Sequence, residues 1–160
     1  MLLNKGHIEQ LGSPEDLYDR PASRFAAEFI GETNLIEGKV ATANGSSVAI
    51  AVADGITFEA PRTDGAGAVG EDVFLMVRPE RVEVMREKPE TGTALSARIT
   101  KRVFSGDMLA LTLTAPDGLE IVSRKPSVSR YRDLDEGSEV WMVLEDCRML
   151  PRDDDTAKTT

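Results

Sequence analysis

The sequence contains little cysteine and few aromatic residues, and both scarcities exclude structural types. Cys147 is the only cysteine among 160 residues, so no disulfide can form within the chain. A lone thiol is compatible with a reducing compartment. Aromatic residues make up 5% of the chain, which is too few for a surface that stacks unpaired bases. An apolar fraction of 41% and a charged fraction of 29% are ordinary for a globular domain that builds its own core.

Long apolar runs and surplus positive charge are also missing. No stretch reaches the length of about eighteen apolar residues that a membrane-spanning helix needs, so we expect no direct membrane insertion. The first residues show no signal-peptide pattern. A net charge of −9 repels phosphate backbones, so nucleic acid is not an expected partner. Together these features predict an acidic, cytoplasmic, globular protein.

The residues of nucleotide and acid–base chemistry are absent as well. No G-x-x-x-x-G-K-[ST] segment occurs, so neither a backbone cradle nor a lysine is available for a nucleotide's phosphates. We therefore expect no ATP hydrolysis, no catalytic residue, no bound cofactor and no metal in this chain. His7 is the only histidine, and without a visible partner it is expected to be a surface residue rather than a general base.

The first 33 residues are predicted to form a hairpin and two short helices. Gly6 can supply the positive φ of a tight turn between two short strands. Ser13 is a good cap for a first helix, and Pro14 suits its first position. A second helix is expected from about Ser23 to Ile30, with Phe25, Phe29 and Ile30 on one face and its end at Gly31.

The rest of the chain alternates between short strands and turns. Strands are expected at 35–42, 47–53, 56–59, 73–77, 82–85, 95–104, 108–114, 119–123 and 139–145, with a surface loop at 61–70 and a helical turn within 128–134. This regular spacing is typical of a closed or nearly closed barrel, which hides its strand edges. Residues 153–160 are charged and polar, and we expect a disordered tail there.

The order of the first 34 residues resembles a known family. The stretch from Asn4 to Tyr18, followed by Pro21, by Phe25 to Gly31 and by Asn34, resembles the end of the nucleotide-binding domain in ABC importer ATPases of the sugar, polyamine and iron type. The segment Val77 to Glu80 resembles a motif of their regulatory domains. Residues 97–151 resemble the transport-associated OB-like repeat, called TOBE, with turns at Gly106 and Gly118.

This resemblance implies a division of the chain and a role for each part. Residues 1–33 would be the end of the ATPase domain and residues 34–152 an OB-like TOBE regulatory domain, so the fold class is mainly β. The chain would be the non-catalytic regulatory and dimerisation region of an ATPase subunit, whose ATP and Mg²⁺ sites lie in a preceding region. Residues 29–35 are most similar to spermidine/putrescine importers, with sugar and iron importers as alternatives.

The resemblance also implies partners and a location. Two copies would meet as a homodimer beneath the importer's transmembrane subunits, at the cytoplasmic side of the inner membrane. The helices are expected to bury apolar faces against the ATPase core, and these faces would be exposed in this chain alone. The candidate interface residues are Leu17, Tyr18, Phe25, Phe29, Arg78 and Glu80. Arg78 could equally be an ordinary surface arginine.

Three other groups of residues suggest different chemistry. Asp153 to Asp155 could bind a cation, although a solvated acidic run is the simpler reading. Glu145 to Cys147 could suggest a metal site, but neighbouring strand residues face opposite sides. Phe104, Tyr131 and Trp141 could stack bases, yet core packing is expected for Phe104 and Trp141. The alternative function is a stand-alone OB-like domain that binds a small oxyanion.

Overall fold

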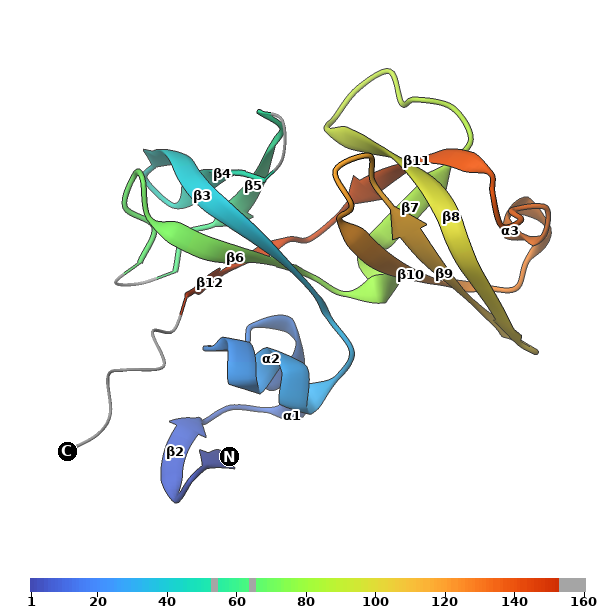
Figure 1. The fold of residues 1–160 in the computed structure, drawn as a ribbon. Helices are drawn as coiled ribbons and strands as arrows, with labels where there is room; N and C mark the ends of the chain where they lie inside the picture. The colour runs from blue at the N-terminus through green and yellow to red at the C-terminus, as the bar shows by residue number, and fades with distance from the viewer. Residues whose placement is uncertain (53–54, 64–65, 153–160) are drawn as a thin grey trace.

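Strands dominate the computed structural model, which describes residues 1–52, 55–63 and 66–152. In Figure 1 a hairpin and two helices lie below two groups of strands, with β3–β6 and β12 on the left and β7–β11 on the right. The hairpin pairs β1 (Leu2–Asn4) with β2 (His7–Gln10). Lys5 and Gly6 turn the chain with φ angles of 48° and 82°, so the predicted glycine turn is confirmed.

The first helix, α1 (Pro14–Asp19), begins where the cap residues predict. The Ser13 side chain accepts a hydrogen bond from the backbone N–H of Asp16, and the Asp16 carboxylate accepts one from the N–H of Ser13. This capping box satisfies donors that have no partner inside the helix. The Ser13 hydroxyl also donates to the Asp16 carboxylate at 2.8 Å, and this bond, followed by the one from the Ser13 N–H, lowers the pKa of the Asp16 carboxyl group.

The second helix, α2 (Arg24–Ile30), is capped by Ser23. Its fully buried side chains are those of Ala26 and Ala27, whereas Phe29 is 65% exposed. Exposure of Phe29 agrees with the expectation that the apolar helix faces are open in this chain alone, and the helix packs within the chain through its alanines instead. Small side chains bring the helix backbone close to the neighbouring elements, and a phenylalanine at these positions would hold it away.

The first sheet has the strand order β12-β6-β3-β4-β5, and all of its pairs are antiparallel. The register of β3 shifts between Val40 and Thr42, which marks a bulge where this long strand bends. Its strands are β3 (Asn34–Asn44), β4 (Ser47–Ala51), β5 (Thr57–Pro61), β6 (Asp72–Val77) and β12 (Arg148–Pro151).

The second sheet has the order β10-β9-β8-β11-β7, again antiparallel throughout. A short 3-10 helix, η1 (Pro79–Arg81), connects the first sheet to it, and α3 (Ser129–Arg132) lies between its last two strands in the sequence. Its strands are β7 (Val82–Met85), β8 (Ala94–Ser105), β9 (Met108–Thr114), β10 (Glu120–Pro126) and β11 (Glu139–Leu144).

Both sheets curl until their outer strands approach each other. β12 contacts β5 in the first sheet, and β10 contacts β7 in the second. Inward-facing side chains alternate with outward-facing ones, as Leu109, Leu111 and Leu113 of β9 illustrate with exposures of 1% or less. One cluster of buried apolar side chains includes members of both sheets. The predicted fold class, mainly β and OB-like, is confirmed.

Three details of the predicted fold differ from the structure. Residues 34–152 contain two curled sheets, whereas the sequence suggested one barrel. The strand β12 was not predicted, because a segment of four residues has no alternating pattern long enough to recognise. The loop expected at 61–70 begins one residue later in the structure, because Pro61 still belongs to β5 and pairs with Ser47 of β4. The expected disordered tail at 153–160 lies outside the described residues.

The large aromatic side chains are not placed as expected. Phe104 is 57% exposed near the end of β8, and Trp141 is half-buried in β11. The predicted core positions are wrong because both side chains fall on outward-facing positions of their strands. Tyr131 of α3, by contrast, is 2% exposed and belongs to the core cluster.

Candidate functional site

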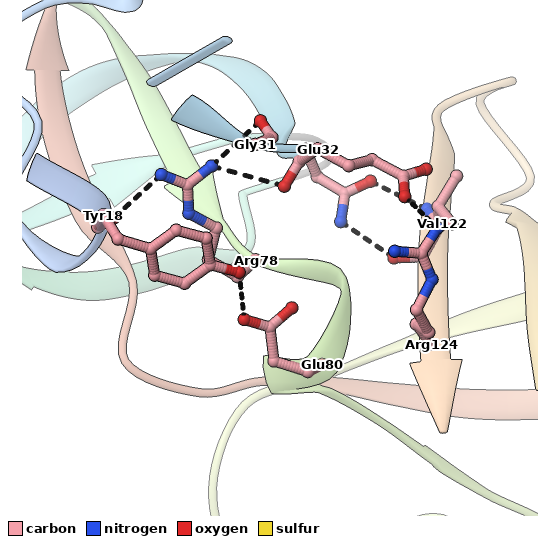
Figure 2. A network of polar contacts seen from close by, with 8 residues as sticks. Tyr18, Gly31, Glu32, Arg78, Glu80, Val122 and Arg124 are labelled. Atoms are coloured by element: carbon pink, nitrogen blue, oxygen red, sulfur yellow. Dashed lines mark hydrogen bonds and ion pairs between the residues drawn. The ribbon is translucent and has the colours of Figure 1, made fainter. Parts of the chain in front are cut away.

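Arg78 immediately follows β6, and its side chain is buried where the helices meet the first sheet. It is 4% exposed, and its guanidinium donates to four backbone carbonyl oxygens, of which Figure 2 draws those of Tyr18, Gly31 and Glu32. Nη2 lies 2.8 Å from the oxygen of Tyr18, and Nη1 lies 3.0, 3.2 and 3.3 Å from those of Ala27, Gly31 and Glu32. Carbonyls near the C-terminal end of a helix lack partners within it, and their partial negative charge suits a cation.

Tyr18 and Glu80 complete the environment of this guanidinium. The Arg78 guanidinium carbon lies 4.2 Å from the centre of the Tyr18 ring, which is the geometry of a cation–π contact. The Tyr18 hydroxyl donates to the Glu80 carboxylate. Burial, followed by this hydrogen bond, raises the pKa of Tyr18. Burial lowers the pKa of Arg78 from its ordinary value of 12.5, but an arginine still carries its charge near neutral pH.

Asn34, the first residue of β3, joins the first sheet to the second. Its side-chain amide donates to the carbonyl oxygen of Val122 at 2.8 Å and accepts from the N–H of Val122 at 2.7 Å. Asn34 is 8% exposed, so this two-way pairing replaces hydrogen bonds that water can no longer make. An ion pair between Glu32 and Arg124 lies beside it (Figure 2).

A second polar cluster surrounds Lys125 on β10, close to η1. Its ammonium, in a residue only 6% exposed, donates to the carbonyl oxygen of Glu80 at 3.0 Å and to the Glu83 carboxylate at 2.9 Å. The Tyr131 hydroxyl donates to the same carboxylate at 2.6 Å. Burial by itself would raise the pKa of Glu83. Hydrogen bonds from Tyr131 and Lys125, together with the charges of Lys125 and Arg130, outweigh burial, so the pKa of Glu83 is lowered. Burial and the bond to Glu83 raise the pKa of Tyr131 to about 12.

These contacts form one connected set, which we call the inter-sheet junction. It connects five elements: the two helices, the start of β3, η1 and β10. The side chains that make these contacts come from different elements and meet only in the folded chain. Its geometry fixes the position of the helices relative to both sheets. It consists of Tyr18, Glu32, Asn34, Arg78, Glu80, Arg124 and Lys125.

Three of the predicted interface residues belong to this junction, namely Tyr18, Arg78 and Glu80. Arg78 is neither an exposed interface residue nor an ordinary surface arginine, because four carbonyls of its own chain surround it. The roles of Asn34 and Lys125 were missed. A buried lysine cannot be recognised from one sequence, because its carboxylate partner lies on a different strand.

The other predicted interface residues are placed on the helices and differ in exposure. Leu17 is 7% exposed and packs with Leu2 and Ala26, so it is already covered within this chain, contrary to the expectation. Phe25 is half-buried against the same cluster, and its ring stacks on Phe29 with 5.7 Å between ring centres. Phe29 alone of these apolar residues remains largely exposed.

A group of exposed apolar side chains lies on the hairpin and the helices that follow it, and we call it the N-terminal apolar surface. Each member has at least 52% of its surface exposed. So many large, exposed apolar side chains within about thirty residues are unusual in a folded chain. They are Met1, Leu3, Ile8, Leu11 and Phe29.

The remaining candidate residues of the sequence analysis do not form a catalytic or metal site within the described ranges. His7 is exposed at the start of β2, as expected for a surface residue. Within residues 1–52, 55–63 and 66–152, no cluster of three metal-ligating side chains occurs. Glu145 and Asp146 are exposed whereas Cys147 is buried. The acidic run Asp153 to Asp155 lies outside the described residues. None of the helices in the described ranges combines the length and apolar composition needed to cross a bilayer.

Comparison with known protein families matches residues 75–150 to the TOBE domain. The chain is also similar to proteins described as "Spermidine/putrescine import ATP-binding protein PotA". It is 36% identical over 141 residues to the protein from Rubrobacter xylanophilus, covering 87% of this chain and 36% of that protein. It is 36% identical over 131 residues to PotA 1 of Pseudomonas aeruginosa, covering 82% and 35%. The chain thus spans well under half of the length of these relatives.

Among solved structures, the fold is similar to that of the cytoplasmic molybdate-binding protein ModG. The TM-score is 0.62 at 17% sequence identity, and the match covers 81% of this chain and 96% of ModG. At this identity the likeness concerns the fold alone. It agrees with an OB-like architecture for both curled sheets.

Proposed function

Because the chain contains a TOBE domain and is similar to the C-terminal part of ABC-importer ATP-binding subunits, we propose that it is the regulatory and dimerisation region of such a subunit. Its task is mechanical: it holds two subunits together and positions the end of each ATPase domain. The chemistry of ATP and Mg²⁺ belongs to another region of that subunit, since this sequence has no phosphate loop.

The inter-sheet junction is the observation that best supports a coupling role. Arg78 holds the ends of both helices, and these helices are the segment that resembles the end of an ATPase domain. Asn34 and the ion pair of Glu32 with Arg124 extend the connection to the second sheet. A movement of the helices would therefore move both sheets as one body.

The N-terminal apolar surface supports an attachment to further protein. Leu3, Ile8 and Phe29 expose apolar area that a neighbouring ATPase core would remove from water. The chain covers 36% of one relative and 35% of another. The remaining length of such a subunit would supply that covering core.

Polyamine import is the substrate assignment that the relatives' names support. The partners would be a second copy of the subunit and the importer's transmembrane subunits, at the cytoplasmic side of the inner membrane. These assignments extend from the relatives to this chain and rest on sequence similarity.

A chimera tests this proposal. The C-terminal part of the Pseudomonas aeruginosa relative would be replaced by residues 1–152 of this chain, and spermidine uptake would be measured in cells that lack their own importer. We expect the chimera to restore uptake and to purify as a dimer, while a truncated relative without any regulatory region does not. A chimera that folds and hydrolyses ATP but transports no better than the truncated form would overturn the proposal.

A stand-alone oxyanion-binding domain is the second candidate, and the likeness of the fold to the molybdate-binding protein ModG supports it. Calorimetric titration of the chain with molybdate, tungstate, sulfate and phosphate separates the two functions. The coupling proposal expects no binding heat in the micromolar range. Saturable molybdate binding by the isolated chain would favour the alternative.

A further inference from the structure

A surface groove of about 660 Å³ lies on the second sheet, on the side turned away from the core. Its floor is built from outward-facing residues of β8 and β11, which pair in register. Ser96 lies opposite Trp141, and Arg98 lies opposite Glu139. At its edge, the hydroxyl groups of Thr100 and Thr114 lie 2.9 Å apart. These side chains face outward because the alternate positions of β8 fill the core.

The charge of this groove is opposite to that of the chain. Arg98 is paired with Glu139 at 3.0 Å, so their charges offset each other. Arg86 donates to the carbonyl oxygen of Asp133 at 2.8 Å, and within the described ranges it forms no ion pair with a carboxylate. The Lys88 ammonium lies 5.2 Å from the centre of the Trp141 ring. In a chain of net charge −9, such a local excess of positive charge attracts an anion.

The groove also offers apolar area beside these charges. Trp141 is half-buried and lines the groove together with the exposed Pro116, whereas the lining residues Ala115 and Val140 are buried members of the core and add little open apolar surface. A tryptophan ring binds flat rings by stacking and holds cations over its face. The contact with Lys88 therefore places a cation directly beside a surface suited to an aromatic group.

Size decides which kind of anion fits. Small-molecule sites typically enclose about 300–1,000 Å³, and this groove lies in that range. A tetrahedral oxyanion would fill only a small part of it and would leave Trp141 uncovered. We propose that the groove binds a small organic anion that carries a flat ring. The ring would lie against the part of Trp141 that lines the groove, and the anionic group would be held by Arg86, which lines it, and by Lys88, which lies outside the lining but contacts the Trp141 ring.

Trp141 is the only tryptophan of the chain, so its fluorescence reports directly on the groove. The folded chain would be titrated with phenyl phosphate, which has both parts of the proposed ligand, and with inorganic phosphate and phenol, which have one part each. We expect saturable quenching by phenyl phosphate, with an affinity at least about tenfold higher than for either half ligand. No saturable change with phenyl phosphate overturns the proposal. Equal affinity for inorganic phosphate overturns the role of the ring.

Variants place the site within the groove. Arg86→Gln and Lys88→Gln are each expected to weaken phenyl phosphate binding about tenfold. Lys101→Gln is the matched control, because Lys101 is exposed on β8 and, unlike Lys88, has no contact with Trp141, and the affinity of this variant should be unchanged. Trp141→Leu, followed by calorimetry, should reduce affinity to that of inorganic phosphate. All four side chains lie at the surface or are half-buried, so circular dichroism should show an intact fold. If the three groove variants bind as tightly as the control, the assignment is wrong.

Discussion

Arg78 is the most deeply buried charged residue among the described residues, and it contacts both helices. Removing a guanidinium from water is unfavourable by several kcal/mol unless fixed partners replace the solvent. Here four carbonyl oxygens and the face of Tyr18 take that place. Those carbonyls would in turn lose their own partner if the arginine were removed, because the residue is 4% exposed.

The first prediction therefore concerns Arg78→Gln. We expect the free energy of unfolding to fall by about 3 kcal/mol, since a shorter amide cannot reach carbonyls on both helices. Urea unfolding followed by circular dichroism measures this change. Arg81→Gln is the control, because Arg81 forms an exposed pair with Asp146 at 3.0 Å and should cost less than about 1 kcal/mol. Equal effects of the two variants would contradict the central role of Arg78.

A second prediction concerns the pH dependence of stability at Glu83. Its pKa in the folded protein is lower than its ordinary value of 4.5, because hydrogen bonds and neighbouring cations outweigh burial. The stabilisation is therefore fully present above about pH 4.5 and is lost as the pH falls through the folded pKa. Unfolding experiments from pH 7 downward should show the difference between the native protein and Glu83→Gln shrinking below this value.

The control for Glu83 is Glu139→Gln. The Glu139 side chain is 81% exposed and pairs only with an exposed arginine. Its replacement should change stability little at any pH in the same series. A Glu83→Gln difference that stays constant down to pH 3 would exclude Glu83 as the source of the pH dependence.

At the scale of the elements, β3 is the strand that organises the first sheet. It pairs with β4 on one side and β6 on the other, and its first residue contacts β10 of the second sheet. Gly38 lies inside it, opposite Val73. A Cβ atom at this position would lie 2.5 Å from the Cγ2 of Ile50 and 2.9 Å from the backbone oxygen of Ala51. The glycine is required because the neighbouring strand approaches so closely.

The third prediction follows from this close approach. Gly38→Ala should lower the free energy of unfolding by about 1–3 kcal/mol, because Ile50 can move but the backbone oxygen of Ala51 cannot. Thermal and urea unfolding both measure the loss. Lys39→Ala is the adjacent control, since Lys39 forms a pair with Asp72 in which both side chains are more than half exposed. A neutral Gly38→Ala would mean that the two strands separate at little cost.

At the scale of the whole molecule, two connections join the sheets. The chain passes from the first sheet to the second through η1 and returns between β11 and β12. Cys147 lies on the return connection, is 5% exposed and belongs to the cluster of buried residues that both sheets share. Burial raises the pKa of its thiol to about 12, with a smaller contribution from Asp146.

The fourth prediction uses this thiol as a probe of the joined sheets. At about pH 8 a free thiol reacts readily with Ellman's reagent, because part of it is thiolate. We expect Cys147 to react only as fast as the protein unfolds, since its thiolate is disfavoured and covered. The reaction rate should rise with urea along the same curve as the loss of circular dichroism. Rapid reaction in the absence of urea would show that the sheets separate without global unfolding.

Much of the fold follows from local patterns in the sequence. Alternating apolar residues predict most strands, including β9 at its observed bounds, 108–114. Ser13 as a cap and Pro14 at the first helical position predict the start of α1, and the order of the first 34 residues carries the family resemblance. These features depend on neighbours within a few positions of one another, so one sequence is enough to recognise them.

Other features are decided only when distant segments meet. The pairing of β12 with β6 joins residues more than seventy positions apart. The choice of Ala27 over Phe29 for the buried face of α2 depends on the strands beneath it. Arg78 becomes a buried junction only because two helix ends bring their carbonyls to it. The sequence alone determined the strands, turns and caps, because these are local preferences. The division into two sheets and the junction that ties them together depend on burial, and burial is set by the packing of the whole chain.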